Sequence, residues 1–150
     1  MNSNKKILNF FCSGFGIGYF PFFPGTIASL LILPFLWLLK ENFTISFIFF
    51  IILVYTVISY VLLRLLKNDK KNIDPSFIVC DEYIGQSLAI LFCSQKITDY
   101  LLAFLIFRFL DIYKPFPISY FDNMKNEYGV LLDDIVAGLI TTFIFYIYYD

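Results

Sequence analysis

The sequence contains no histidine, and this absence excludes several kinds of hydrolytic chemistry. Ser-His-Asp and Cys-His hydrolysis, zinc sites built on imidazole and phosphatases with a histidine nucleophile all require that side chain. Any reaction of this chain must therefore use carboxylates, hydroxyls, Lys, Arg, backbone amides or a hard metal ion. The three cysteines are odd in number and have no CxxC spacing, so they indicate packing residues rather than a disulfide framework or a zinc site.

Charge is also scarce: 15% of the residues are charged, whereas 59% are hydrophobic and 21% aromatic. A soluble domain of 150 residues would expose large apolar patches with this composition, and a membrane accounts for the excess directly. The net charge of -1 and the lack of a basic stripe exclude nucleic acid as an expected partner. No repeat or long linker is visible, so we treat residues 1–150 as one domain.

Apolar segments predict about four to five membrane-embedded helices. Residues 43–63 form an uncharged stretch of 21 residues, close to the roughly 20 that a helix needs to cross the hydrocarbon. Proline and glycine interrupt the front half of residues 17–39, so we expect irregular backbone there and a regular helix from about Thr26. The last segment, residues 135–149, is apolar and ends in aromatic residues typical of a membrane boundary.

The apolar region 83–107 is interrupted by polar residues at positions 95–99. It predicts two shorter helices joined by a turn, with Thr98 as the N-cap of the second. With the N-terminus inside, nine Lys and Arg residues lie on the cytoplasmic side and only Lys40 and Lys96 lie outside, as the positive-inside rule favours. The expected fold is an all-α polytopic membrane helical bundle with one re-entrant or hairpin element and a site formed by cytoplasmic loops.

Acidic residues gather in the two segments that this topology places on the cytoplasmic face. The pairs Asp81–Glu82 and Asp133–Asp134 each stand immediately before an apolar helix. Neighbouring carboxylates raise each other's proton affinity unless a cation lies between them. Acidic capping of a helix N-terminus explains one pair, but it explains two pairs and Asp111 less well. Because the ligands are oxygens and histidine is absent, the expected ion is Mg²⁺, which commonly bridges carboxylates to phosphate.

Two further features suit a phosphate group. The glycine-rich segment 12–26 precedes a helix start and offers backbone N–H groups and the Thr26 hydroxyl; a packing or re-entrant loop is the alternative. Arg108 and Lys114 flank Asp111 and would hold phosphate oxygens that the carboxylates repel. A simple ion pair between Arg108 and Asp111, at i and i+3 of one helix, is the other interpretation.

These residues resemble the phosphatidylglycerophosphatase A family in three blocks. The blocks are Gly16-x-Gly18 with Pro21, Pro24-Gly-Thr26 and Ser29; Asp74-Pro-Ser-Phe-Ile-Val-Cys-Asp-Glu-x-x-Gly85; and Phe107-Arg-x-x-Asp-x-x-Lys-Pro-x-Pro-Ile118, which leads to Asp122 and Gly129-Val-Leu-Leu-Asp-Asp-x-x-Ala-Gly138. The chain departs from the family pattern where Ala28 replaces Gly, Phe116 replaces Trp and Asn126-Glu127 replaces a Gly-Gly pair.

The resemblance implies Mg²⁺-dependent hydrolysis of phosphatidylglycerol phosphate, a membrane phospholipid, at the cytoplasmic side of a bacterial inner membrane. By position it implies catalytic roles for Asp81, Asp111, Asp133 and Asp134, metal binding by Asp81, Glu82, Asp133 and Asp134, and substrate binding by Gly25, Thr26, Ser29, Asp74, Arg108 and Lys114. Attack by water and an aspartyl-phosphate intermediate both stay open. A small cation-binding transporter or assembly subunit is the alternative function, because broken helices and intramembrane polar groups occur there too.

Overall fold

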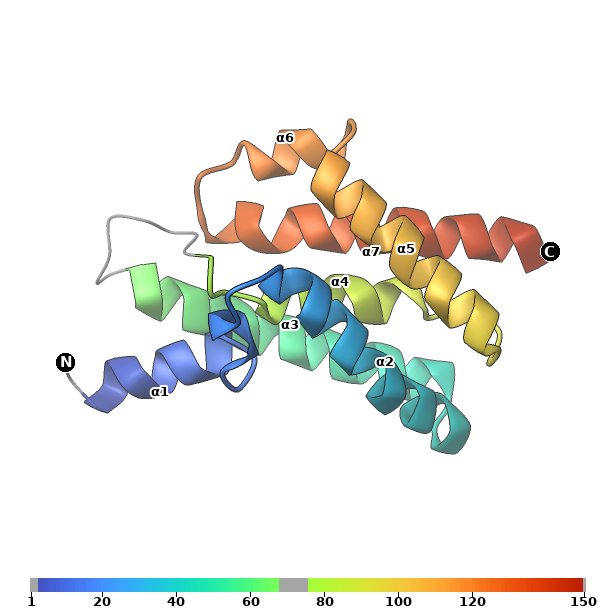
Figure 1. Ribbon diagram of the computed structural model, residues 1–150, viewed down its shortest axis with the longest axis horizontal. Helices are drawn as coiled ribbons and strands as arrows, with labels where there is room; N and C mark the ends of the chain where they lie inside the picture. The colour runs from blue at the N-terminus through green and yellow to red at the C-terminus, as the bar shows by residue number, and fades with distance from the viewer. Residues whose placement is uncertain (1–2, 68–75, 150) are drawn as a thin grey trace.

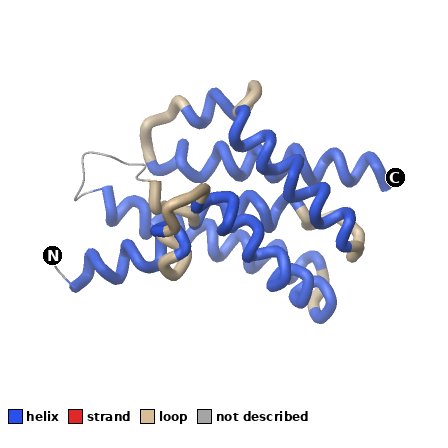
Figure 2. Tube along the Cα trace, viewed as in Figure 1, coloured by secondary structure: helices blue, strands red, loops and turns tan. Residues whose placement is uncertain are grey.

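The computed structural model describes residues 3–67 and 76–149, and every regular element within them is helical (Figure 1, Figure 2). In chain order the elements are α1 (Ser3–Cys12), the short 3-10 helix η1 (Ile17–Tyr19), α2 (Pro24–Asn42), α3 (Ile45–Lys67), α4 (Cys80–Ala89), α5 (Ile97–Tyr113), α6 (Ile118–Asp122) and α7 (Glu127–Tyr149). The predicted all-α class is confirmed.

Among the described residues, three helices are long and apolar enough to cross a membrane: α2, α3 and α7. Helix α3 covers nearly all of the predicted crossing and continues past it to Lys67. Large apolar side chains such as Phe35 and Phe50 are exposed on these helices, as expected for a surface that faces lipid rather than water. The chain is therefore a membrane protein with several apolar helices.

The expected hairpin is present as α4 and α5. Helix α4 has 10 residues and is about 15 Å long at 1.5 Å per residue, half of the roughly 30 Å hydrocarbon core. It therefore ends inside the bundle, where it packs against α7, α2 and α3 (Figure 1). Helix α5 begins at Ile97 after the extended Lys96, so Thr98 lies inside the first turn and the prediction that it is the N-cap is wrong.

The C-terminal end of α4 is buried, and its carbonyl groups need hydrogen-bond donors from elsewhere, because the last four carbonyls of a helix have no partner within it. The Lys40 ammonium group, at the end of α2, donates to the carbonyl oxygens of Ile90 at 3.0 Å and Cys93 at 2.5 Å. The Thr142 hydroxyl of α7 donates to the carbonyl of Leu88. Thr142 thus binds a carbonyl in the last turn of α4, and Lys40 binds the C-cap residue and the loop that follows, at the end of α4 opposite the charged site described below.

Two glycines allow α4 and α7 to cross closely. A Cβ atom added to Gly138 would lie 2.3 Å from the carbonyl oxygen of Gly85, and one added to Gly85 would lie 2.7 Å from the carbonyl oxygen of Asp134. Small residues at a crossing let two membrane helices approach to backbone contact. The crossing therefore fixes the position of Asp134 relative to the first turn of α4.

The segment between α1 and α2 is irregular, as its prolines and glycines predict. It contains η1, and α2 begins at Pro24, two residues earlier than expected, with proline in its first turn. A Cβ on Gly18 would lie 1.8 Å from the Phe77 carbonyl oxygen, so this loop packs tightly against the chain that leads into α4. The loop and the start of α4 thus form one packed unit.

Candidate active site

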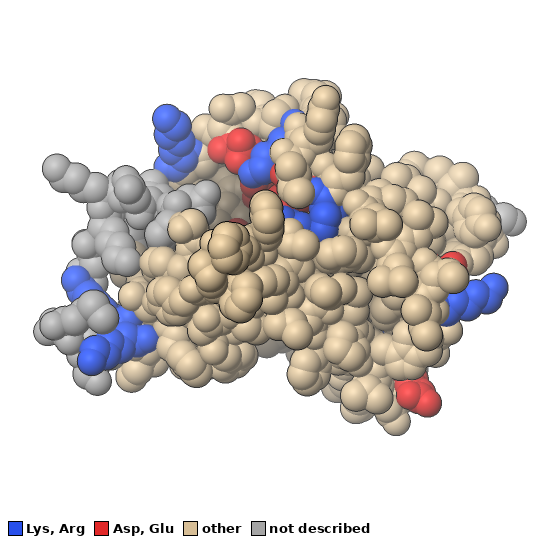
Figure 3. Space-filling view, in the orientation of Figure 1, with Lys and Arg blue, Asp and Glu red and all other residues tan. Residues whose placement is uncertain are grey.

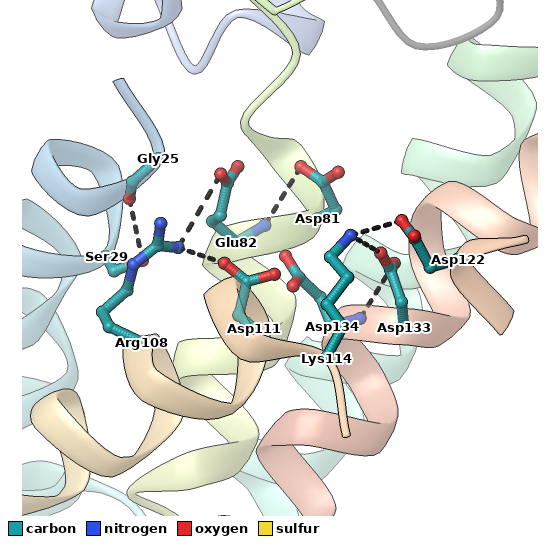
Figure 4. Close-up of polar contacts among 10 residues, drawn as sticks. All are labelled: Gly25, Ser29, Asp81, Glu82, Arg108, Asp111, Lys114, Asp122, Asp133 and Asp134. Carbon is teal, nitrogen blue, oxygen red and sulfur yellow. Dashed lines mark hydrogen bonds and ion pairs between the residues drawn. The ribbon is translucent and has the colours of Figure 1, made fainter. Parts of the chain in front are cut away.

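Charged side chains from four helices meet at one end of the bundle (Figure 4). They are Asp81 and Glu82 in the first turn of α4, Arg108 and Asp111 near the end of α5, Lys114 directly after α5, Asp122 at the end of α6, and Asp133 and Asp134 in α7. In the space-filling view, red and blue side chains gather in the region where Figure 1 places α6 and the adjoining end of α5 (Figure 3). The structure thus assembles the two acidic pairs and both cations that the sequence singled out.

The prediction that each acidic pair stands immediately before a helix is wrong, because α4 begins at Cys80 and already contains Asp81 and Glu82. Asp133 and Asp134 were expected immediately before an apolar helix, but α7 already begins at Glu127 and carries both in its second turn. Val130 to Leu132, which lie between the helix start at Glu127 and Asp133, are apolar and helical. The membrane helix therefore starts earlier than its hydropathy suggests. The pair is consequently held on a rigid helix and both side chains are buried.

The carboxylates are close enough to share a cation. Oxygen atoms of Asp81, Glu82 and Asp134 lie within 4.8 Å of one another, and so do oxygen atoms of Asp111, Asp133 and Asp134. Asp134 belongs to both groups and is only 3% exposed. The cluster combines residues from α4, α5 and α7, so no segment of the chain forms it alone.

The two cations divide the cluster between them. Arg108 Nη1 lies 2.7 Å from an Asp111 oxygen and 3.8 Å from a Glu82 oxygen. Lys114 donates to Asp122 at 2.5 Å and to Asp133 at 2.7 Å. Burial alone would lower the pKa of Lys114, but its bonds to these two carboxylates outweigh that effect and raise the pKa above its ordinary value. Lys114 therefore stays charged at neutral pH.

Several polar atoms in the cluster are buried without a hydrogen-bond partner in the described part of the chain. They include Glu82 Oε2, Asp134 Oδ1 and Arg108 Nε. Burial raises the pKa of Glu82 to about 7, although Asp81 and Arg108 lower it. Buried unpaired carboxylate oxygens are costly unless an ion or another donor satisfies them, so these atoms indicate a binding site.

The first turn of α2 closes one side of the cluster. A Cβ on Gly25 would lie 1.8 Å from Glu82 Oε1 and 3.3 Å from Arg108 Nη2, so only glycine fits at this position without a shift. Ser29 is fully buried and donates its hydroxyl to the Gly25 carbonyl at 2.9 Å, so this group is already bonded within α2. Thr26 is half-buried in the same turn.

Two other residues complete the comparison with the sequence. Asp74, which the resemblance implies in substrate binding, lies outside the described residues. Gln86 was not singled out, yet it is fully buried and both polar atoms of its amide lack a partner in the part of the chain that the structure describes. It lies one helical turn after Glu82, on the same face of α4. A polar residue four positions after an acidic one, within an apolar helix, was the signal that would have found it.

Fold and site together define an integral membrane protein with a buried cluster of carboxylates and two cations at one end of a helical bundle, an arrangement suited to phosphate esters. The profile of the family described as Phosphatidylglycerophosphatase A matches residues 10–149. The chain belongs to the phosphatidylglycerophosphatase A family, and it is accordingly a phosphatase.

Three relatives are similar to the chain over different lengths. The phosphatidylglycerophosphatase A of Escherichia coli is 36% identical over 135 residues, which cover 89% of this chain and 78% of the relative. The protein of that name from Haemophilus influenzae is 40% identical over 68 residues, 44% of this chain and 42% of the relative. A Bacteroides thetaiotaomicron protein provisionally named a phosphatidylinositol-3-phosphatase is 31% identical over 140 residues, 85% of this chain and 84% of the relative. No solved structure matches the chain significantly.

Proposed function

We propose that the chain hydrolyses phosphatidylglycerol phosphate to phosphatidylglycerol and phosphate, and that it needs Mg²⁺ to do so. The main observation that supports this proposal is the two groups of three carboxylates that share Asp134 and lie beside Arg108 and Lys114. Within each group the carboxylate oxygens lie within 4.8 Å of one another. Membership of the phosphatidylglycerophosphatase A family supports the choice of substrate.

The carboxylates fit a Mg²⁺ ion. Each Mg–oxygen bond is roughly 2.0–2.1 Å, so two ligands on opposite sides of the ion are about 4.2 Å apart. Adjacent ligands are about 3 Å apart in the same octahedral geometry. The oxygens of Asp81, Glu82 and Asp134 lie within 4.8 Å of one another, so side-chain rotations would bring them to these separations. The unpartnered oxygens of Glu82 and Asp134 would supply two of the ligands. Asp133, in the second group, would hold the ion or orient its ligands.

Charge balance supports the same requirement. The cluster contains the carboxylates of Asp81, Glu82, Asp111, Asp122, Asp133 and Asp134 and the cations Arg108 and Lys114. Six carboxylates against two cations leave an excess of four negative charges when all are ionised. A phosphate monoester is itself an anion and would be repelled by this excess. A divalent cation reverses the local balance and allows the phosphate to approach.

Each residue has a proposed part in the reaction. Bound Mg²⁺ would supply charge neutralisation at the phosphoryl oxygens and activate a nucleophile. Arg108 would donate to phosphate oxygens through its planar guanidinium group, which Asp111 holds in place at 2.7 Å. Lys114 would fix the Asp133 carboxylate and offer a second positive charge. Asp81 or Asp134 would then take a proton from the attacking water or attack phosphorus directly.

We also propose that the site faces the cytoplasm of a bacterium, at the inner membrane. Arg108 and Lys114 lie at the site end of the bundle, whereas Lys40 binds carbonyl groups at the opposite end of α4. This separation agrees with an excess of Lys and Arg on the cytoplasmic side. Accessibility of a cysteine placed at Lys125, near the site, to an impermeant thiol reagent in intact cells tests it: labelling there would overturn the orientation.

The function is tested by phosphate release from dibutyryl phosphatidylglycerol phosphate, with purified protein in detergent. We expect release that EDTA abolishes and Mg²⁺ restores, and loss of at least a hundredfold in Asp81→Asn and Asp134→Asn with normal membrane insertion. Glu41→Gln, which changes an exposed acid at the far end of α2, is the matched control and should behave as wild type.

The outcomes separate the candidate functions. Near-normal activity in both Asn variants would mean that the site is misplaced. No release, while the Escherichia coli relative works in the same mixture, would refute the phosphatase and favour a cation-binding transporter or assembly subunit. Phosphatidylinositol 3-phosphate should be included as a second substrate, because the name of the Bacteroides relative points to that headgroup.

A further inference from the structure

An apolar groove lies between α2 and α3, on a different face of α4 from the charged cluster. Its volume is about 390 Å³, within the range of roughly 300–1,000 Å³ that small-molecule sites occupy. Its walls come from α2, α3, α4 and the loop before α2, and none of the described residues that line it is charged. On α4, Tyr83, Ile84 and Ser87 line the groove, whereas Glu82, one position earlier, lies in the charged cluster.

Two of the three polar side chains in the groove, Ser87 and Tyr83, are already bonded, and Tyr55 is the third. The Ser87 hydroxyl donates to the Tyr83 carbonyl at 2.6 Å, and the Tyr83 hydroxyl donates to the Gly14 carbonyl at 3.4 Å. A polar ligand would therefore find few free donors or acceptors on these walls. Because a buried polar group without partners is unfavourable, the groove suits hydrocarbon.

The groove runs parallel to the membrane-crossing helices. On α2 it extends from Leu31 to Leu39 and on α3 from Ile48 to Tyr55, which corresponds to about 10–12 Å along each helix axis at 1.5 Å per residue. Both helices are long enough to cross a membrane. A hydrocarbon chain that lies in this groove therefore points in the same direction as the acyl chains of the surrounding bilayer.

Two features connect the groove to its surroundings. Leu31 and Phe35 line it and are 44% and 63% exposed on the surface that faces lipid, so a chain can enter sideways from the bilayer. Phe15 and Ile17 of the glycine-rich loop line the end of the groove that is next to the first turn of α4. That turn also carries the carboxylates of the charged cluster, so this end of the groove lies beside the site.

We propose that the groove binds part of one acyl chain of the lipid substrate while the phosphate of the same molecule lies in the charged cluster. This inference rests on the proposed lipid phosphatase function. We assign the groove to the substrate rather than to bulk lipid, because one end of the groove adjoins the helical turn of Asp81 and Glu82. The ester group of the bound acyl chain would lie at that end. The groove would then distinguish substrates by their chains and not by their headgroups.

The test compares long-chain and short-chain substrates in variants that fill the groove. Leu31→Trp and Ile51→Trp each place a bulky side chain at a lining position. Leu30→Trp and Leu53→Trp are matched controls on the same helices, at positions that are exposed to lipid and do not line the groove. We expect KM for dioleoyl phosphatidylglycerol phosphate to rise about tenfold in the two filling variants only. This corresponds to about 1.4 kcal/mol, less than the burial of two methylene groups.

The dibutyryl substrate supplies the internal reference. Its KM should stay within twofold of wild type in all four variants, because its chains are too short to fill the groove. Equal effects on both substrates, or no effect in either filling variant, would overturn the inference while the phosphatase function stands. A wild-type protein that releases phosphate from neither substrate would refute the function instead.

A binding measurement keeps the inference testable in that last case. Native mass spectrometry of the detergent-purified protein should show dioleoyl phosphatidylglycerol phosphate retained by wild type and Leu53→Trp, and lost from Ile51→Trp. If Ile51→Trp loses added dioleoyl phosphatidylethanolamine but retains the phosphatidylglycerol phosphate, the groove holds bulk lipid and the inference is wrong.

Discussion

Replacement of Gly138 by alanine should displace the Asp134 carboxylate from the charged cluster, although Gly138 itself is not part of that cluster. The new Cβ would lie 2.3 Å from the Gly85 carbonyl oxygen, whereas ordinary contacts of a Cβ atom begin at about 3.4 Å. Helices α4 and α7 must therefore separate by about 1 Å at their crossing. Asp134 lies one turn before Gly138 on α7, so its carboxylate would move away from Asp81 and Glu82 by a similar amount. A misplacement of about 1 Å can lower turnover about a hundredfold.

The assay measures phosphate release from the dibutyryl substrate and the Mg²⁺ concentration that gives half of the maximal rate. For Gly138→Ala we expect turnover about a hundredfold lower and a higher Mg²⁺ requirement, with the protein still monodisperse in detergent. Leu139→Phe adds more volume at the adjacent position, which is 48% exposed to lipid, and should leave both values unchanged. Alanine also favours a helix over glycine by up to about 1 kcal/mol, so unfolding is not the expected cause. Activity above half of wild type in Gly138→Ala would refute the idea that the crossing aligns the carboxylates.

Two further substitutions test the cation at each end of the bundle. Arg108→Lys keeps the charge but loses the planar guanidinium group held by Asp111. We therefore expect kcat/KM to fall tenfold to a hundredfold, in line with about 1.5–3 kcal/mol for a charged hydrogen bond. Arg64→Lys, an exposed change on α3, should have no effect, and equal kcat/KM in the two variants would argue against phosphate binding by Arg108. Lys40→Met removes the ammonium donor to the carbonyls of Ile90 and Cys93, just after α4, so thermal unfolding in detergent should begin several degrees lower with unchanged KM, as expected for a loss of about 1–3 kcal/mol. An unchanged unfolding temperature would show that water or another group satisfies those carbonyls.

The parts of the fold that local chemistry dictates were predictable from the sequence. Prolines and glycines before Pro24 predict irregular backbone, and the structure has it there. Polar residues at positions 95–99 predict a break between two helices, and α4 and α5 are separated at that point. The acidic pairs were also recognisable as candidate site residues, because adjacent carboxylates in an apolar membrane chain are costly and therefore indicate a function.

The features that depend on contacts between distant segments were not predictable. Nothing near Gly85 in the sequence indicates that its carbonyl touches Gly138, yet this contact aligns the acidic residues of α4 and α7. Hydropathy also placed the start of the last helix too late, because Asp133 and Asp134 lower the average over a segment that is helical from Glu127. The groove between α2 and α3 is likewise invisible in the sequence, since its walls read as ordinary lipid-facing helices.

Helix dipoles favour some charges of the site but cannot balance the whole cluster. Helices α2 and α4 both begin at the site, and each N-terminus is equivalent to about half a positive charge. The acidic first turn of α4 and Lys114, the C-cap residue of α5, stand at termini that favour their sign. Two N-termini contribute about one positive charge, against an excess of four negative charges when all six carboxylates of the cluster are ionised. The remainder is too large for backbone dipoles, and a divalent cation is the component of the proposed mechanism that offsets it.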